Sequence, residues 1–374
     1  MAKTKPTSKE KKKSKSRQRE KSLLHNTGCL SSNPHTPSQP AESTETLLAA
    51  ATTLLHTNHE PAEALALAAK ALQQSPTSLP ALELLAEIHV ELGDVATAYT
   101  LYSRAAELDP TGNHESSGGS GPEKFLWLAQ LSPEGGVDAV RWYEKGVDVL
   151  QRFITAGGTV QKDLSERNLE RKLVSALCGL AEIYMSDLCM EPDAEARCET
   201  YVTEALLAVP DSAEALQTLA SVRISQQRLP DAVAALERAV AVWKDLEAEN
   251  VEMPSYAARI SQARLLIETE QYETAIEVLE RLQAEDDQLP DLWYLGGWTL
   301  FLLGERERSR KDGRAELWEA AREWLKTCQQ VGYISYSDLV GLRADGWCSS
   351  TTPLNGKTKE SGNTPRSYWQ RFWR

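Results

Sequence analysis

The sequence predicts an all-α protein built from repeated pairs of antiparallel helices, and three observations carry this prediction. Apolar residues make up 41% of the 374-residue chain, and Leu and Ala dominate them while Phe occurs only four times, which favours helices over strands. Helical periodicity is nearly continuous from Glu42 to about Tyr333. One spacing of small and large apolar residues also recurs along this stretch.

The clearest copy of this repeat lies at residues 82–110. Packing residues follow one helical face, a Gly-Asp pair makes the turn, small residues return on the second helix, and a proline closes the unit. These residues are Leu82, Leu85, Ala86, His89, Gly93, Asp94, Ala98, Tyr102, Ala105 and Pro110. Small alanines let the two helices approach closely. This 34-residue frame is typical of the tetratricopeptide repeat, whose helix pairs stack into a solenoid.

The same frame recurs before and after this copy, which gives about seven repeats. In chain order the other markers are Leu48, Ala51 and Leu55 with Ala64, Ala68 and Ala71; residues 125–131 with Ala139, Tyr143 and Gly146; Leu177, Leu180 and Ala181 with Cys198, Val202 and Ala205; Leu216, Leu219 and Ala220 with Ala232, Leu236 and Ala239; Ala263 and Leu266 with Ala275, Leu279 and Leu282; and Trp293, Gly297 and Leu300 with Ala320, Trp324 and Thr327. The copy at 125–146 is degenerate, and the last one carries an insertion near 305–314. Several copies in one frame favour a solenoid over an irregular helical bundle.

The chain divides into three predicted parts. Residues 1–40 form a basic, Ser- and Pro-rich tail that we expect to be disordered, because it cannot bury enough apolar surface. Residues 41–335 form the repeat solenoid, and the low-complexity residues 336–374 are again expected to be disordered. The Lys/Arg run at 11–17 predicts contact with the nuclear import machinery, and a merely solvated tail is the alternative. The run has no interleaved aromatic residues for stacking on bases.

Charge is strongly segregated along the sequence. Residues 1–21 hold ten Lys or Arg, whereas residues 22–340 hold 25 basic and 50 acidic residues. Such an acidic body repels nucleic acid and anionic membranes and attracts basic proteins. We therefore expect a basic protein partner, with no direct nucleic-acid binding and no membrane contact. No apolar segment typical of a secretion signal follows the basic start, so we expect a cytoplasmic and nuclear location.

No pattern in the sequence predicts catalysis, a metal or a cofactor. His56 and His59 lie three residues apart, but nothing nearby completes a set of three or four ligands. The six cysteines show no paired spacing. The Gly-rich stretch at 117–121 follows no strand, and the one ending at 356–358 lacks the first glycine of a phosphate loop. We expect a protein that is not an enzyme and needs no cofactor.

The candidate partner-binding residues lie on the first helix of each repeat, because these helices line the concave surface of a solenoid. They are Glu83, Glu87, Glu91, Glu182, Asp291, Tyr294 and Trp298. One end of the groove is thus predicted to be acidic and the other aromatic. Two alternatives stay open: the carboxylates could be ordinary solvated surface, and Tyr294 and Trp298 could pack against a terminal helix. An acidic groove has the wrong charge for an adaptor that grips acidic chaperone tails.

Two stretches outside the repeat consensus resemble a known family. They are EKFLWLAQL at 123–131, followed by EGG at 134–136 and RWYE at 141–144, and WYLGGW at 293–298. These stretches resemble the fungal assembly chaperones of large-subunit ribosomal protein four, over roughly residues 1–335. The resemblance implies a non-enzymatic chaperone that captures the basic internal loop of the ribosomal protein and escorts it to pre-ribosomes. A generic tetratricopeptide scaffold or co-chaperone adaptor for another basic protein is the alternative.

The end of the chain departs from this family. The resemblance implies a further acidic helical stretch there, whereas residues from about Val331 to Arg374 are basic and end in SYWQRFWR. We expect that a changed exon boundary or reading frame explains the difference.

Overall fold

The computed structural model describes residues 43–112, 121–156, 164–307 and 311–332, and within these ranges it contains fourteen α-helices and no strand. The predicted tails, including the basic run at 11–17, lie outside the described residues. The helices form seven consecutive pairs: α2 (Thr44–His56) and α3 (Pro61–Gln74), α4 (Leu79–Glu91) and α5 (Val95–Leu108), α7 (Glu123–Gln130) and α8 (Gly136–Ala156), α9 (Leu164–Met185) and α10 (Ala194–Ala208), α11 (Ala213–Ser225) and α12 (Leu229–Trp243), α13 (Tyr256–Glu268) and α14 (Tyr272–Glu285), and α15 (Pro290–Arg306) and α16 (Lys311–Gly332). The predicted all-α solenoid of about seven helix pairs is confirmed.

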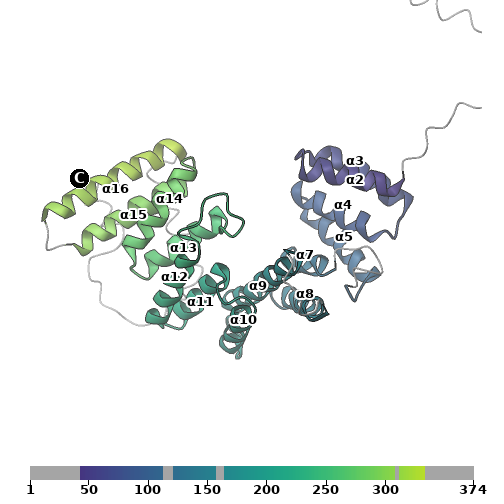
Figure 1. Cartoon of the computed structure of the whole chain (residues 1–374), viewed down its shortest axis with the longest axis horizontal. Coiled ribbons are helices and arrows are strands. Elements are labelled where there is room, and N and C mark those ends of the chain that lie inside the picture. Colours follow the sequence, from purple (N-terminus) through teal and green to yellow (C-terminus); the bar gives the residue numbers. More distant parts are fainter. Residues whose placement is uncertain (1–42, 113–120, 157–163, 308–310, 333–374) are drawn as a thin grey trace, which may run out of the picture.

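The pairs follow one another along an open arc, with α2–α5 at one end and α15–α16 at the other (Figure 1). Each second helix packs against the first helix of the next pair. First helices also contact each other directly, in the pairs α2 with α4, α9 with α11, α11 with α13, and α13 with α15. In Figure 1, α7 and α9 face the opening of the arc, with α8 and α10 behind them. In these two pairs the first helix lies on the inner side, as expected for a solenoid of helix pairs, and we call the first helices the inner helices.

Serine residues begin several of these inner helices. The side chains of Ser43, Ser78, Ser212 and Ser255 accept hydrogen bonds from backbone N–H groups in the first turns of α2, α4, α11 and α13. Such N-caps satisfy donors that a helix start leaves free, and each stabilises its helix by about 1 kcal/mol. The caps fix where each inner helix begins and so place its residues in register with those of the neighbouring inner helix.

The turn inside a pair has the same backbone conformation in four repeats. Gly93, His59, Gln227 and Glu270 all have φ between 56° and 78°, and they occupy equivalent positions just after the first helix. Only one of the four is a glycine, although this left-handed region favours glycine. The packing of the two helices therefore holds the turn where the local sequence does not favour it.

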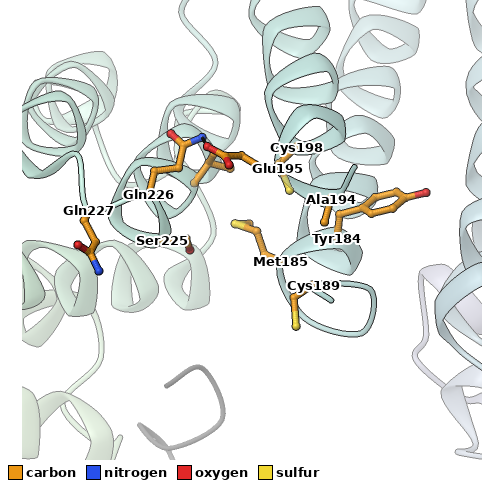
Figure 2. A pocket seen from close by; sticks show the side chains of 10 residues that line it. Tyr184, Met185, Cys189, Ala194, Glu195, Cys198, Ser225, Gln226 and Gln227 are labelled. Atoms are coloured by element: carbon orange, nitrogen blue, oxygen red, sulfur yellow. Dashed lines mark hydrogen bonds between the residues drawn. The ribbon is translucent and has the colours of Figure 1, made fainter. Parts of the chain in front are cut away.

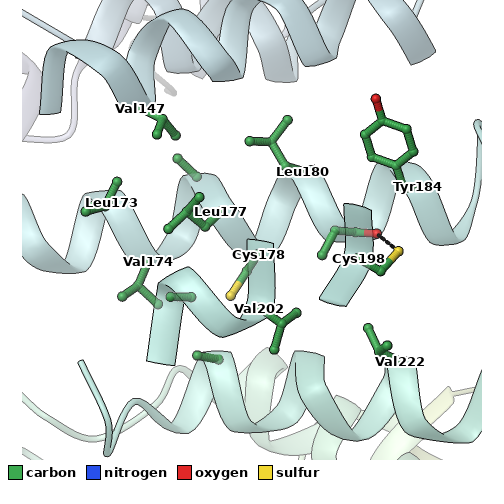
Figure 3. Close-up of a cluster of buried hydrophobic side chains, with 14 of the residues drawn as sticks. Val147, Leu173, Val174, Leu177, Cys178, Leu180, Tyr184, Cys198, Val202 and Val222 are labelled. Carbon is green, nitrogen blue, oxygen red and sulfur yellow. Dashed lines mark hydrogen bonds between the residues drawn. The ribbon is translucent and has the colours of Figure 1, made fainter. Parts of the chain in front are cut away.

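The largest core cluster lies in the middle of the solenoid, between α8, α9, α10 and α11 (Figure 3). Leu177, Leu180 and Val202 are almost completely buried there. Cys178 and Cys198 fill the space between the helices, and the Cys198 thiol donates to the backbone carbonyl of Ala181 at 3.5 Å. This core holds the inner helices α9 and α11 against each other.

In the last pair, helices α15 and α16 approach each other at two consecutive glycines. A Cβ atom added at Gly296 would come within 2.1 Å of the Trp324 ring, and one at Gly297 would come within 2.6 Å of Leu325. The WYLGGW stretch noted in the sequence is therefore a close helix contact, in which glycine leaves room for two large side chains.

Candidate partner-binding surface

One of the predicted groove residues, Glu83, is only 8% exposed. Its Oε1 atom lies 3.8 Å from the ammonium of Lys124, which is completely buried and also lies 2.8 Å from Asp109 Oδ2. The lysine comes from the following helix pair, 41 residues later in the chain. The expectation that Glu83 is exposed to a partner is therefore wrong, because Lys124 draws its carboxylate into the contact between the second and third pairs.

The other two acidic residues of α4 lie further along the helix. Glu87 is half-buried, and its Oε1 atom lies 3.8 Å from Nε2 of His56 on α2. Burial, the main cause, raises the pKa of the Glu87 carboxyl, with Glu123 and Glu91 adding repulsion and His56 opposing it. Glu91 is exposed at the end of α4. Both carboxylates are thus accessible from the inner side of the arc.

At the opposite end, the predicted acidic and aromatic residues already have neighbours. Asp291 is exposed but accepts a 2.7 Å hydrogen bond from Arg264 of α13. Tyr294 and Trp298 are half-buried in a cluster with Leu317, Trp318 and Trp324 of the last helix. Trp298 also stacks on Phe301 with ring centroids 5.6 Å apart. Both aromatic residues thus belong to an apolar cluster that the last helix helps to form, as the second alternative expects.

The middle of the inner surface carries three acidic residues on three consecutive inner helices, Glu182 of α9, Glu214 of α11 and Glu268 of α13. All three are exposed. Within the residues that the structure describes, no ion pair involves any of them. Other acidic residues on first helices, such as Glu123 and Asp291, are paired with Lys172 and Arg264. These three carboxylates, which we call the central carboxylates, lie on consecutive inner helices and have no ion-pair partner among the described residues.

The surroundings of the central carboxylates disfavour the ionised form of these side chains. Burial is the largest cause that raises the pKa of Glu182, and repulsion from Glu214 raises it further. Burial also raises the pKa of Glu214 and Glu268, while a 2.8 Å hydrogen bond from Ser175 partly offsets the effect at Glu214. The side chains reach water, but the neighbouring inner helices displace much of the surrounding solvent. A bound cation would offset the free-energy cost of ionising these carboxyl groups.

A cavity of about 410 Å³ opens between α9, α11 and the start of α13. Glu182 and Glu214 both line it, and Gln217, Ser261 and Gln262 are among its other polar lining residues. Gln262 is 2% exposed, and its Oε1 atom accepts a 2.9 Å hydrogen bond from the indole of Trp243. We call this space the central cavity.

A second cavity, of about 340 Å³, lies where the end of α9 and the start of α10 meet the end of α11 (Figure 2). Its polar groups bond to each other: Gln226 Nε2 donates to Glu195 Oε1 at 3.0 Å. Met185 and Cys189 supply its apolar wall. It therefore presents fewer free polar groups to a ligand than the central cavity does.

Two of the three central carboxylates and Gln262 were not among the residues predicted from the sequence. Glu214 occupies the position in its repeat that Asp291 occupies in the last one, and this shared position could have indicated it. Glu268 is the last residue of α13, equivalent to Glu91 on α4. Gln262 gives no such signal, because its role depends on a contact with Trp243 in another helix pair.

The described residues hold no group of three or more His, Cys, Asp or Glu side chains placed to bind a metal ion. None of the helices in the described ranges is both long enough and apolar enough to cross a membrane.

The fold and this surface define a tetratricopeptide-repeat protein with an acidic inner face. Two models of the tetratricopeptide repeat match residues 55–114 and 218–290. Two curated proteins are each named "Probable assembly chaperone of rpl4". The one from Emericella nidulans is 44% identical over 324 residues, 82% of this chain and 79% of the relative. The one from Schizosaccharomyces pombe is 40% identical over 259 residues, 69% of this chain and 74% of the relative.

A solved structure agrees with these relatives. The structure described as assembly chaperone of RpL4 (Acl4), residues 1–338, is 41% identical, covers 71% of this chain and 99% of its own, and has a TM-score of 0.66. The chain belongs to this family of assembly chaperones. The family resemblance predicted from residues 123–144 and 293–298 is thereby confirmed.

Proposed function

We propose that this protein is a dedicated assembly chaperone that binds ribosomal protein rpl4, as the names of its relatives state for them. The bound part would be a basic, extended segment such as the internal loop of the ribosomal protein, lying along the inner surface of the arc. The observation that carries this binding mode is the row of central carboxylates on α9, α11 and α13.

The energetics of exposed ion pairs and of long-range attraction support this mode of binding. Exposed ion pairs contribute only about 0.2–1 kcal/mol each, so affinity has to come from several contacts along the groove. Long-range attraction from a body with 25 basic and 50 acidic residues would mainly speed association. Covering the basic segment would keep it from RNA and from aggregation until it is released at the pre-ribosome.

Two further inferences concern catalysis and cellular location. We infer a non-enzymatic role, because a chaperone needs binding and release and no bond chemistry. The acidic body disfavours direct contact with nucleic acid or anionic membranes. The basic run at residues 11–17 would engage the nuclear import machinery, which suits a protein that acts in both the cytoplasm and the nucleus.

The test is capture from a cell extract followed by mass spectrometry, at 0.1 M and 1 M salt. We expect one dominant basic ribosomal protein, rpl4, whose capture falls at high salt because the screening length shrinks from about 10 Å to about 3 Å. A mixed set of partners without rpl4 would show that the protein is a general scaffold. Removal of residues 1–21 should leave capture intact and reduce nuclear accumulation.

A further inference from the structure

We propose that the central cavity is a subsite for one arginine residue of a bound peptide: Glu182 and Glu214 hold the guanidinium, and Gln262 donates to a main-chain carbonyl beside it. This inference rests on the proposed function and specifies which side chain the groove selects. It depends on three features of the cavity: the two carboxylates, the lack of an ion pair to either of them within the described residues, and a buried amide donor without a hydrogen-bond partner there.

The carboxylates come from neighbouring inner helices, α9 and α11, and both line the same cavity. Repulsion from Glu214 adds to burial in disfavouring the ionised form of Glu182. In the described part of the chain, neither forms an ion pair. Arg171, which lines an adjoining cavity next to Glu214, is already paired with Glu252. A cation placed between Glu182 and Glu214 would interact favourably with both.

Gln262 supplies the observation that points to a peptide. The Trp243 indole can only donate, so its hydrogen bond fixes the amide oxygen of Gln262 toward Trp243. The Nε2 group is then left without a hydrogen-bond partner among the described residues, although the side chain is 98% buried. A buried donor without an acceptor destabilises the folded protein. A ligand that brings an acceptor to the cavity would remove this destabilisation.

Together these features select the chemistry of the ligand. A metal ion or a polyamine offers positive charge but no acceptor for Gln262. An amino-acid residue within a peptide offers both a cationic side chain and a carbonyl. Arginine suits two carboxylates on separate helices better than lysine does, because its planar guanidinium presents five donors, whereas the lysine ammonium is a compact, strongly hydrated charge.

The test uses the full chain and two short capped peptides, Gly-Gly-Arg-Gly-Gly and Gly-Gly-Lys-Gly-Gly, which carry equal charge. Binding is followed by NMR through the side-chain amide signal of Gln262 and the indole signal of Trp243. We expect the arginine peptide to shift the Gln262 signal and to bind about tenfold more tightly than the lysine peptide, as the loss of one charge-assisted hydrogen bond implies.

The variant Glu182→Gln with Glu214→Gln should abolish this preference. Its control is Glu204→Gln with Glu237→Gln, which removes the same charge from exposed positions on the second helices α10 and α12 and should keep the preference. Equal binding of both peptides by the wild-type protein, or a preference that survives in the Glu182/Glu214 variant, would overturn the subsite. Because the peptides replace rpl4, these results stand whether or not the extract experiment recovers that protein.

Discussion

The ammonium of Lys124 lies 2.8 Å from the carboxylate of Asp109, and the two side chains are 0% and 7% exposed. Asp109 follows the last residue of α5 and Lys124 belongs to α7, so the pair joins the second repeat to the third. Glu83 of α4 adds a second carboxylate at 3.8 Å. This buried group positions the N-terminal repeats relative to the centre of the groove.

Lys124→Met should therefore destabilise the protein strongly, by about 3–5 kcal/mol, because it leaves two buried carboxylates without their cation. Lys172→Met is the matched control: Lys172 also pairs with an acidic residue of another repeat, Glu123, but both side chains are 41% exposed. Its loss should cost about 1 kcal/mol or less. Chemical denaturation followed by circular dichroism measures both values, and similar costs for the two variants would contradict the structural role of Lys124.

Gly296→Ala should destabilise the last helix pair by about 1–3 kcal/mol, because the added methyl group meets the rigid Trp324 ring at about 2 Å. At Gly313 in α16, by contrast, an added Cβ would meet no atom within 4 Å apart from the nearby backbone of its own helix. Gly313→Ala should instead be neutral or stabilise by about 0.5–1 kcal/mol through helix propensity. In thermal unfolding, the melting temperature of the Gly296→Ala variant should fall, whereas that of the Gly313→Ala variant should stay the same or rise. Similar falls for both variants would count against the close contact.

Glu182→Gln with Glu214→Gln should raise the melting temperature at pH 7 while weakening partner binding. Folding raises the pKa of both carboxyls, so their ionised forms destabilise the folded state at pH values above the ordinary value of 4.5. After allowance for solvent screening, the gain is about 1 kcal/mol or less. The variant with Glu204→Gln and Glu237→Gln should not show this rise in melting temperature.

The same pKa shifts predict how this gain depends on pH. As pH falls from 7 toward 4.5, the two carboxyls take up protons in the folded state first, and wild-type stability approaches that of the Glu182/Glu214 variant. Scanning calorimetry at several pH values would reveal this convergence. A stability difference that stays constant or widens with acidification would show that burial does not raise these pKa values.

The four cysteines within the described ranges should differ strongly in their reactivity toward alkylating reagents. Burial raises the pKa of Cys178 to about 12 and those of Cys198 and Cys328 to about 11, so their thiols stay protonated and inaccessible at neutral pH. Cys189 is exposed. Brief treatment with iodoacetamide followed by peptide mass spectrometry should therefore label Cys189 well before the other three. Rapid labelling of Cys178 would contradict the tight core between α9 and α10.

The sequence was sufficient to predict the fold because the repeat signal is local. Residues such as Leu82, Ala86 and Ala105 recur at fixed spacings, and each is completely buried. The left-handed turns at Gln227 and Glu270 could not be foreseen, because neither residue type favours that conformation and only the packing of the helix pair imposes it.

The binding surface was harder to predict because it depends on contacts between repeats. Glu83 occupies a groove position in its own helix, yet Lys124 of the next repeat buries it. Glu182 was named from the sequence as a groove residue and is exposed on α9, but the sequence did not indicate Glu214, which lies 32 positions later and shares the central cavity. The position of a carboxylate within the repeat therefore does not show whether it forms an ion pair inside the protein or stays accessible on the inner surface.

The most direct test of the account compares the binding of rpl4 to two variants with equal loss of charge. The inner variant carries Glu182→Gln, Glu214→Gln and Glu268→Gln on α9, α11 and α13. The outer variant carries Glu204→Gln, Glu237→Gln and Glu280→Gln at exposed positions of α10, α12 and α14. Affinities are measured by interferometry at low salt. We predict that the inner variant binds rpl4 roughly 3- to 100-fold more weakly than wild type, from three lost ion pairs, and that the outer variant binds as wild type does. Equal affinities for the two variants would contradict binding at the inner surface.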